Sequence, residues 1–172
     1  NYITKQQQTF TILITSSISG EGKTFCSINL ASAYAVSGKK TLIIGADLRR
    51  PKIFNDFNLK NSLGLSTYLI GKASLQEVIQ ETEQENLYLI SSGPIPPNPS
   101  ELIETDKMAE FFKEAQQIYD IIIIDTPPIG LVTDAMILMQ YSDVNLYVVR
   151  QRYTNKSQLG LINQLYVDKK VA

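Results

Sequence analysis

Histidine and tryptophan are absent from this 172-residue sequence, and cysteine occurs once, as Cys26. A single cysteine cannot form a disulfide within the chain, and its isolation argues against zinc and iron–sulfur sites. The lack of histidine also excludes the histidine-based triads of nucleophilic catalysis. Chemistry in this chain must therefore rest on carboxylates, hydroxyls, lysine and arginine.

Neither sign of charge dominates, since 16 basic residues face 17 acidic ones for a net charge of −1. This balance gives no electrostatic footprint for nucleic acid or for an anionic membrane. The sequence also lacks an apolar run of about 20 residues, which is the length needed to span a bilayer. It shows no basic segment followed by an apolar one, the pattern of a secretion leader. We therefore expect a cytoplasmic chain that does not bind nucleic acid. Its length and its 44% apolar content suit a single domain over residues 1–172, which we expect to belong to a longer protein.

A glycine-rich stretch at residues 16–24, with the sequence S-S-I-S-G-E-G-K-T, stands between a strand-like and a helix-like run. It fits the P-loop pattern except at its first position, where Ser17 replaces glycine. Gly20 and Gly22 permit the tight backbone that points N–H groups at a phosphate. Lys23 supplies a positive charge and Thr24 a hydroxyl for Mg²⁺. The alternative is an ordinary strand-to-helix turn, but such a turn does not require Lys-Thr directly after Gly-Glu-Gly.

Strand-like runs alternate with helix-like ones along the chain, which predicts an α/β fold with a doubly wound, mostly parallel sheet. The nearly continuous apolar runs indicate strands that are covered on both faces, as in the three-layer αβα P-loop NTPases. We predict strands at 9–15, 40–44, 87–90, 121–125 and 144–149. We predict helices at 24–37, 65–70, 75–79, 99–117, 133–141 and 154–167.

Two carboxylates follow buried strands at the end where open α/β sheets bind ligands. Asp125 comes after four isoleucines, and burying its charge is costly unless it meets a cation or strong donors. In a P-loop protein that partner is Mg²⁺, although a carboxylate capping a nearby loop is the alternative. Asp47 follows the second strand, and its alternative is a solvated turn residue. Arg49 and Arg50 fit a solvated turn and a phosphate contact equally well.

A proline-rich segment, G-P-I-P-P-N-P-S-E at 93–101, leads into the predicted helix at 99–117. Asn98 and Glu101 have the spacing of a capping box, and Pro99 takes the first helical position, where its missing N–H does no harm. Stiffness is all that the prolines guarantee, so a stiff connector remains the alternative to a functional loop.

Four segments together resemble the bacterial tyrosine kinase (BY-kinase) family, whose members regulate the export of capsular polysaccharide and exopolysaccharide. They cover nearly the whole chain in the family's order: S-S with G-E-G-K-T at 16–24, A-D-L-R-R-P at 46–51, P-P-N-P-S-E-L at 96–102 and D-T-P-P at 125–128. The resemblance implies three nucleotide motifs: Walker A at 17–24, Walker A′ at 42–49 and Walker B at 121–125.

The family's cofactors are ATP and Mg²⁺, and its activity is protein-tyrosine phosphorylation. By this resemblance, Lys23, Asp47 and Asp125 would carry catalysis, and Thr24, Asp47 and Asp125 would hold the metal. The nucleotide would lie against the Walker A residues, which are Ser19, Gly20, Glu21, Gly22, Lys23, Thr24 and Phe25.

The resemblance also implies partners and a location. The partners are neighbouring copies that form a ring in the complete protein, a polysaccharide co-polymerase membrane region or partner protein, a tyrosine-rich tail and a counteracting tyrosine phosphatase. The domain would sit at the inner face of the cell membrane through a region outside this chain. No Glu-x-x-Arg-x-x-Arg oligomerisation helix precedes the first strand, and only Tyr153 and Tyr166 fall in the last twenty residues. We therefore expect this chain alone to be monomeric or weakly associated.

Two positions depart from the family pattern inside the motifs. Ser19 stands where the family usually has proline. Gly45 replaces the first aspartate of Walker A′, the residue often assigned as the base that takes the tyrosine proton. Because a positioned base contributes about 10²–10⁴-fold to rate, its loss should slow transfer without abolishing it, and Asp47 is available to substitute.

Three functions follow from these motifs. The first is an ATP-dependent tyrosine kinase that acts in trans on neighbouring copies and controls polysaccharide assembly. The second is an ATP-binding scaffold or switch of the same complex with little transfer, which Gly45 would favour. The third is a septum-positioning ATPase, but that class has a signature lysine at the position of Ile18. Reductases of the same class need cluster cysteines, which Cys26 alone cannot provide.

Overall fold

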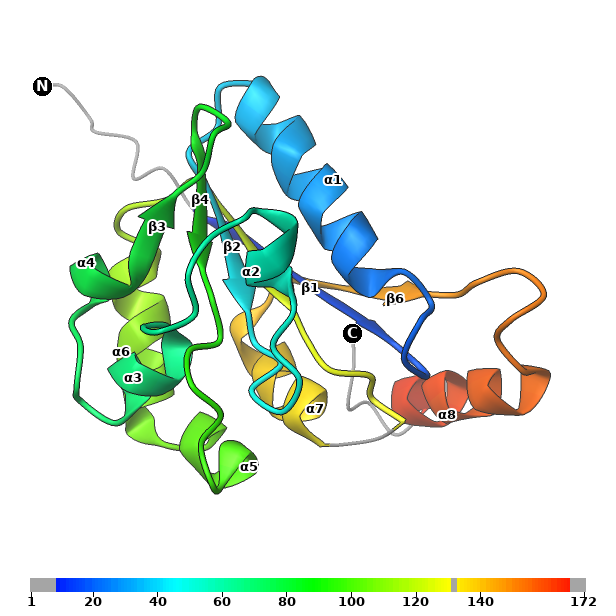
Figure 1. The fold of residues 1–172 in the computed structure, drawn as a ribbon. Coiled ribbons are helices and arrows are strands. Elements are labelled where there is room, and N and C mark those ends of the chain that lie inside the picture. Colours follow the sequence, from blue (N-terminus) through cyan, green and yellow to red (C-terminus); the bar gives the residue numbers. More distant parts are fainter. Residues whose placement is uncertain (1–8, 131–132, 168–172) are drawn as a thin grey trace, which may run out of the picture.

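The computed structural model describes residues 9–130 and 133–167. Its centre is a six-stranded sheet in the order β3-β4-β2-β5-β1-β6 (Figure 1). Five strands run parallel, and only β3 pairs antiparallel, with β4, at one edge. The strands are β1 (Phe10–Ser16), β2 (Thr41–Gly45), β3 (Ile79–Glu81), β4 (Leu87–Ile90), β5 (Ile121–Asp125) and β6 (Val144–Val148). The predicted mostly parallel α/β sheet is confirmed.

Helices cover both faces of this sheet. They are α1 (Lys23–Val36), α2 (Ile53–Asp56), α3 (Leu65–Leu69), α4 (Leu75–Val78), α5 (Pro99–Ile103), α6 (Asp106–Ala115), α7 (Asp134–Leu138) with the 3₁₀ turn η1 (Met139–Tyr141), and α8 (Lys156–Val167). Residues of α1 and α2 pack on one face, and residues of α3 to α7 pack on the other (Figure 1). No helix among the described residues has both the length and the apolar character needed to cross a membrane.

Side chains of the central strands alternate between the two faces of the sheet, and both faces are buried. Successive side chains of a strand point to opposite faces, so the four isoleucines of β5 divide between two cores. Ile121 and Ile123 belong to the α1 side, whereas Ile122 and Ile124 belong to the other side. The β-branched sequence therefore suits a strand with an apolar layer above and below it.

The strand register places three chain segments at one edge of the sheet. Asp125, the last residue of β5, is aligned with Gly45 of β2 and with Ile14 of β1. The loops that follow β1, β2 and β5 therefore leave the sheet side by side at its carboxyl end. This is the end at which open α/β sheets bind ligands.

The predicted helix at 99–117 is wrong as a single element, because it divides into α5 and α6. Thr105 breaks it with an extended backbone (φ −72°, ψ 154°), and its hydroxyl donates to the carbonyl of Leu102. Threonine favours such local side-chain bonds over a continuous helix. Pro99 does open α5, as predicted, although Asn98 donates to the Glu101 carboxylate instead of forming a capping box. The short elements α2 and β3 were not predicted.

Candidate active site

The loop between β1 and α1 has the backbone of a phosphate-binding loop. Gly20 and Gly22 take left-handed conformations, with φ of +88° and +100°, which side chains rarely tolerate. Gly22 precedes the first residue of the 14-residue helix α1 and offers no side chain to cap it. The N–H groups of the first helical turn thus remain available, and the positive end of the helix dipole lies at the same place. Lys23 opens the helix and is largely buried, with 9% of its surface exposed.

Glu21 holds this loop together from within. Its carboxylate accepts a hydrogen bond from the N–H of Ile18 at 2.8 Å and another from the Thr154 hydroxyl. Burial by itself would raise the pKa of Glu21, but the hydrogen bonds from Thr154 and Ile18 lower it below its ordinary value. The side chain is absent from the lining of the pocket described below. A nucleotide contact at position 21 is therefore left to the backbone, and it stays a prediction.

The segment after β6 contacts the outside of the same loop. Arg150 donates to the carbonyl of Gly20 at 2.9 Å, and the Tyr153 hydroxyl donates to the carbonyl of Ser19 at 3.0 Å. The Tyr147 hydroxyl is also hydrogen-bonded to the hydroxyl of Ser17. These partners lie about 130 residues away from the loop in sequence, so only the β1–β6 pairing brings them together. No motif in the sequence points to these contacts.

Asp125 and Thr24 form the centre of the site. The carboxylate of Asp125 is 5% exposed and accepts hydrogen bonds from the Thr24 hydroxyl at 2.8 Å and the Ser27 hydroxyl at 3.0 Å. Burial raises the pKa of Asp125 to about 6, although these two bonds and the charge of Lys23 pull it down. Asp125, Thr24 and Lys23 are thus brought together as the sequence predicted, whereas Ser27 was missed because one turn of helix separates it from the motif.

Asp47 lies in the loop after β2 and folds that loop back on itself. Its Oδ1 atom accepts the backbone N–H groups of Arg49 and Arg50, at 3.1 and 2.9 Å. Its Oδ2 atom accepts no hydrogen bond from the described residues. The charge of Asp47 contributes to the raised pKa of Asp125, so the two carboxylates act on the same region. Asp47 is therefore placed with the predicted metal-binding residues.

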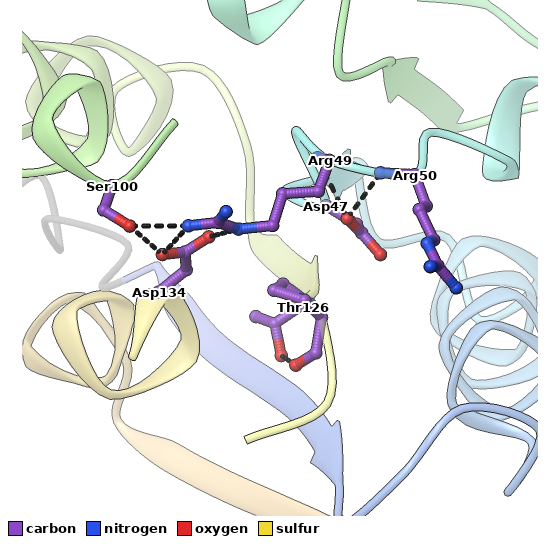
Figure 2. A network of polar contacts seen from close by, with 7 residues as sticks. Asp47, Arg49, Arg50, Ser100, Thr126 and Asp134 are labelled. Atoms are coloured by element: carbon purple, nitrogen blue, oxygen red, sulfur yellow. Dashed lines mark hydrogen bonds and ion pairs between the residues drawn. The ribbon is translucent and has the colours of Figure 1, made fainter. Parts of the chain in front are cut away.

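The two arginines after Asp47 separate, as Figure 2 shows. The Arg49 side chain turns to Asp134, with its Nε atom 3.0 Å from Oδ2 of that buried carboxylate. The Arg50 side chain points the other way and makes no ion pair with a described residue. Arg49 is consequently bound to the protein, and Arg50 is left with its charge unpaired beside the pocket.

The environment of Gly45 leaves no room for a side chain. A Cβ atom built there would lie 2.7 Å from the Cγ2 methyl of Ile53 and 3.3 Å from the hydroxyl of Ser92. Contacts under 3.0 Å require a neighbour to move. The methyl group of α2 thus fills the space that an aspartate would take in the family pattern.

These residues surround one pocket of about 540 Å³ at the carboxyl end of the sheet. Its size is within the range of small-molecule sites. Most predicted site residues line it: Ser19, Gly20, Gly22, Lys23, Thr24, Phe25, Asp47 and Asp125. Five further cationic or polar lining residues were not assigned by sequence, or were left open there: Arg49, Arg50, Lys52, Ser92 and Thr126.

Two carboxylates and a hydroxyl beside a phosphate loop suit Mg²⁺. This ion takes oxygen ligands and is commonly bound by one or two carboxylates together with substrate phosphates and water. Asp125, Asp47 and Thr24 supply such oxygens. The described residues contain no group of three acidic, histidine or cysteine side chains that could hold a metal ion by themselves. The donor set therefore fits a metal that arrives with a nucleotide.

Comparison with known families and proteins gives a consistent relationship. Residues 9–168 match the model of an AAA-domain family. The chain is 42% identical to the tyrosine-protein kinase YwqD of Bacillus subtilis over 152 residues, which cover 88% of this chain and 64% of that protein. It is 38% identical to the tyrosine-protein kinase CpsD of Streptococcus pneumoniae over 154 residues, covering 89% of this chain and 68% of that protein. The chain thus spans about two thirds of the length of these relatives.

Solved structures agree with this relationship. The crystal structure of the chimerical protein CapA2B2 superimposes with a TM-score of 0.90 at 40% identity, over 95% of this chain and 73% of that one. The kinase domain of the Escherichia coli tyrosine kinase ETK superimposes with a TM-score of 0.90 at 36% identity. The match covers 98% of this chain and 66% of that one. The septum site-determining protein MinD of Pyrococcus horikoshii, complexed with Mg-ADP, superimposes with a TM-score of 0.78 at 26% identity. The match covers 95% of this chain and 67% of that one. The P-loop NTPase fold predicted from the sequence is confirmed.

Proposed function

Because this chain belongs to the family of bacterial tyrosine-protein kinases, we propose that it transfers the terminal phosphoryl group of Mg·ATP to tyrosine side chains of neighbouring copies. The observation that carries this proposal is the buried carboxylate of Asp125, held by Thr24 and Ser27 at the mouth of the phosphate loop. A buried charge of this kind needs a cation, and the adjacent pocket is large enough to admit a nucleotide.

Each residue has a defined part in the proposed reaction. Mg·ATP supplies the phosphoryl group when it is bound. The backbone N–H groups of the loop and the ammonium of Lys23 bind the phosphates and neutralise their charge, which carries most of phosphoryl transfer. Thr24 and Asp125 would hold the metal, and Asp47, the third oxygen donor of the site, is assigned to proton transfer instead. The low exposure of Lys23 and Asp125 strengthens both interactions, because charges act more strongly away from water.

Asp47 is the proposed base. The position of the usual first aspartate is Gly45, and Ile53 fills the space beside it. The Oδ1 atom of Asp47 is occupied by two backbone N–H groups, so the Oδ2 atom is the one that takes the proton from the acceptor tyrosine. The base is then offset by two residues from the family pattern, and we expect slow but measurable transfer.

We assign this activity to the control of capsular polysaccharide and exopolysaccharide assembly, at the inner face of the cell membrane. The partners in this assignment are other copies arranged in a ring, a co-polymerase membrane region or partner protein, a tyrosine-rich tail and an opposing tyrosine phosphatase. Support comes from family membership and from the similarity to the tyrosine-protein kinase CpsD of Streptococcus pneumoniae.

Mass spectrometry of phosphotyrosine tests the activity. The chain is incubated with Mg·ATP and a tyrosine-rich acceptor peptide, and is compared with Lys23→Ala and with Lys39→Ala. Lys39 is an exposed lysine just beyond the C-terminal end of α1, so its variant is a matched control. We expect label with the wild type and Lys39→Ala and none with Lys23→Ala. Equal label with Lys23→Ala would reject the proposed site.

A second candidate is an ATP-binding scaffold or switch that transfers little phosphate. The observation that favours it is the methyl group of Ile53 in the space of the missing base. Calorimetric titration with ADP and Mg²⁺ separates the two functions. Tight binding that needs Lys23, without any phosphotyrosine on the peptide, would establish the scaffold instead of the kinase.

A further inference from the structure

A cluster of three side chains joins the loop after β2 to the helices α5 and α7. Arg49 donates to Asp134 through Nε at 3.0 Å and through Nη2 at 3.3 Å, and Nη2 also donates to the Ser100 hydroxyl at 2.7 Å. Ser100 in turn donates to Oδ1 of Asp134 at 2.6 Å. We call this the Arg49–Asp134–Ser100 network, and Figure 2 shows its three members meeting from separate segments.

The network is costly to break because its carboxylate is fully buried. Asp134 is 0% exposed, and a buried charge left without its partner is strongly destabilising. Of the two ion pairs among the described residues, this one has a buried member, whereas Lys107 and Glu110 are both half exposed on α6. The Arg49 fork also fits a carboxylate in two places, which fixes direction as well as distance. The network therefore holds Arg49 in one position.

Arg49 is tied at both of its ends. Its side chain is held by Asp134 and Ser100, while its backbone N–H is held by Oδ1 of Asp47 together with that of Arg50. The same loop is thus clamped between its own carboxylate and the buried Asp134. Any movement of the Arg49 backbone changes the orientation of the Asp47 carboxylate, because the two are joined by a hydrogen bond across only two residues.

The proline-rich segment at 93–101 supplies the third member. Pro99 starts α5 with a fixed backbone and no N–H to satisfy, so the next residue, Ser100, leaves the loop in a defined direction. The Ser100 hydroxyl bonds to both Arg49 and Asp134. Stiffness, the property that sequence analysis could guarantee for this segment, thus serves to place one hydroxyl beside the ion pair.

We infer that Asp134 and Ser100 are positioning residues for Asp47, which they orient through Arg49. This inference rests on the proposed function only in the part that concerns transfer; the orientation of the loop is a property of the chain itself. Arg49 consequently does not serve as a phosphate ligand, and Arg50 is the arginine of this loop whose charge remains available to an anion. Neither Asp134 nor Ser100 touches the reacting groups.

Hydrogen exchange and kinetics test the inference together. Asp134→Asn, Ser100→Ala and Arg49→Lys are compared with the wild type by NMR, which follows exchange of the Arg49 and Arg50 amides. We expect faster exchange at these two amides in all three variants. We also expect kcat for peptide phosphorylation to fall about tenfold to a hundredfold in Asp134→Asn, with KM for ATP nearly unchanged, because small misplacements of a reacting group cost about this much.

Glu110→Gln is the matched control, since it removes the other ion pair, on the exposed surface of α6. It should leave amide exchange and kcat at their wild-type values. Wild-type exchange at Arg49 and Arg50 in Ser100→Ala and Arg49→Lys would overturn the inference, and these two variants decide the question if Asp134→Asn does not fold. An inactive wild type would reject the proposed kinase, but the exchange of the two amides would still test the network.

Discussion

At the scale of single residues, the space around Gly45 determines whether a carboxylate can stand there. We predict that Gly45→Asp alone destabilises the protein by about 1–3 kcal/mol, because its Cβ would lie 2.7 Å from the Ile53 methyl. The double variant Gly45→Asp with Ile53→Ala should lose less stability than the two single variants added together, because the Ile53 methyl is then absent. It should also transfer phosphate up to about 10²-fold faster than the wild type, since a second base then lies beside Asp125.

The measurements are urea denaturation for stability and kcat for peptide phosphorylation. Ile53→Ala by itself is the control: it should cost about 2–5 kcal/mol through its cavity and give no acceleration. A single Gly45→Asp variant that is as stable as the wild type would contradict the role given to the Ile53 methyl.

The buried carboxylate of Asp125 predicts a pH dependence of the metal-free protein. Burial raises the pKa of Asp125 from an ordinary 3.8 to about 6, so the folded chain holds this proton more tightly than the unfolded chain. Protonated Asp125 therefore adds to the free energy of unfolding. This contribution is complete below pH 4, and it is lost as the pH rises through about 6, which lowers the free energy of unfolding by about 3 kcal/mol in total. Asparagine does not titrate, so Asp125→Asn does not lose this stability as the pH rises. The variant should be more stable than the wild type at pH 8, and the difference should vanish near pH 4.

Urea denaturation in EDTA from pH 4 to pH 8 measures this effect, and taking the difference between the two proteins cancels the titration of the other groups. A difference that does not change with pH would contradict the raised pKa.

The site residues whose mutual position could be predicted from the sequence are those fixed by near neighbours in the chain. Lys23 and Thr24 follow the loop glycines directly, and Asp125 ends its strand. Arg49 and Arg50 could not be separated, because the buried partner of Arg49 is Asp134, 85 residues further along the chain. An arginine fits a solvated turn and an ion pair equally well until the fold supplies the carboxylate.

At the scale of elements, the turn between β6 and α8 is expected to support the phosphate loop. Tyr153→Phe removes the bond to the Ser19 carbonyl, and Arg150→Ala removes the bond to the Gly20 carbonyl. A hydrogen bond of this kind is worth about 0.5–1.5 kcal/mol, so each variant should bind Mg·ADP about two- to tenfold more weakly. Calorimetric titration gives the affinities.

Arg152→Asn provides the control for this turn. Arg152 has a positive φ of 62°, which asparagine tolerates, and its side chain forms no hydrogen bond with the described residues. Its affinity for Mg·ADP should equal that of the wild type. Loss of affinity in Arg152→Asn as large as in Tyr153→Phe would show that the turn acts through its general shape and not through these two bonds.

Elements were predicted best where the apolar pattern is long. The central strands can be predicted from their own sequences because they are apolar on both faces. Helix α1 can be predicted likewise because one side of it is apolar. The division of 99–117 into α5 and α6 depends on Thr105, one residue whose side chain satisfies its own backbone. The strand β3 is three residues long, and its pairing with β4 rather than its own pattern makes it a strand.

At the scale of the whole molecule, the site lies where chain segments that are far apart in the sequence meet at one end of the sheet. The pocket is lined from the loops after β1, β2 and β5, and the segment after β6 supports the first of these. A ligand in this pocket therefore contacts several parts of one cooperative structure. Its binding energy should appear in the unfolding of the entire domain and not in one loop alone.

We predict accordingly that Mg·ADP raises the free energy of unfolding by about 2.7 kcal/mol at a hundred times its Kd and by about 4.1 kcal/mol at a thousand times. Thermal unfolding with increasing ADP, at fixed Mg²⁺, measures this gain. Lys39→Ala should respond like the wild type, because Lys39 lies beyond the end of α1 that is remote from the pocket, whereas Lys23→Ala should show no gain. Omitting Mg²⁺ should reduce the gain, since Asp125 then faces the phosphates without a cation between them and like charges repel. An equal gain with and without Mg²⁺ would contradict the assignment of Asp125 and Thr24 as metal ligands while leaving the phosphate loop intact.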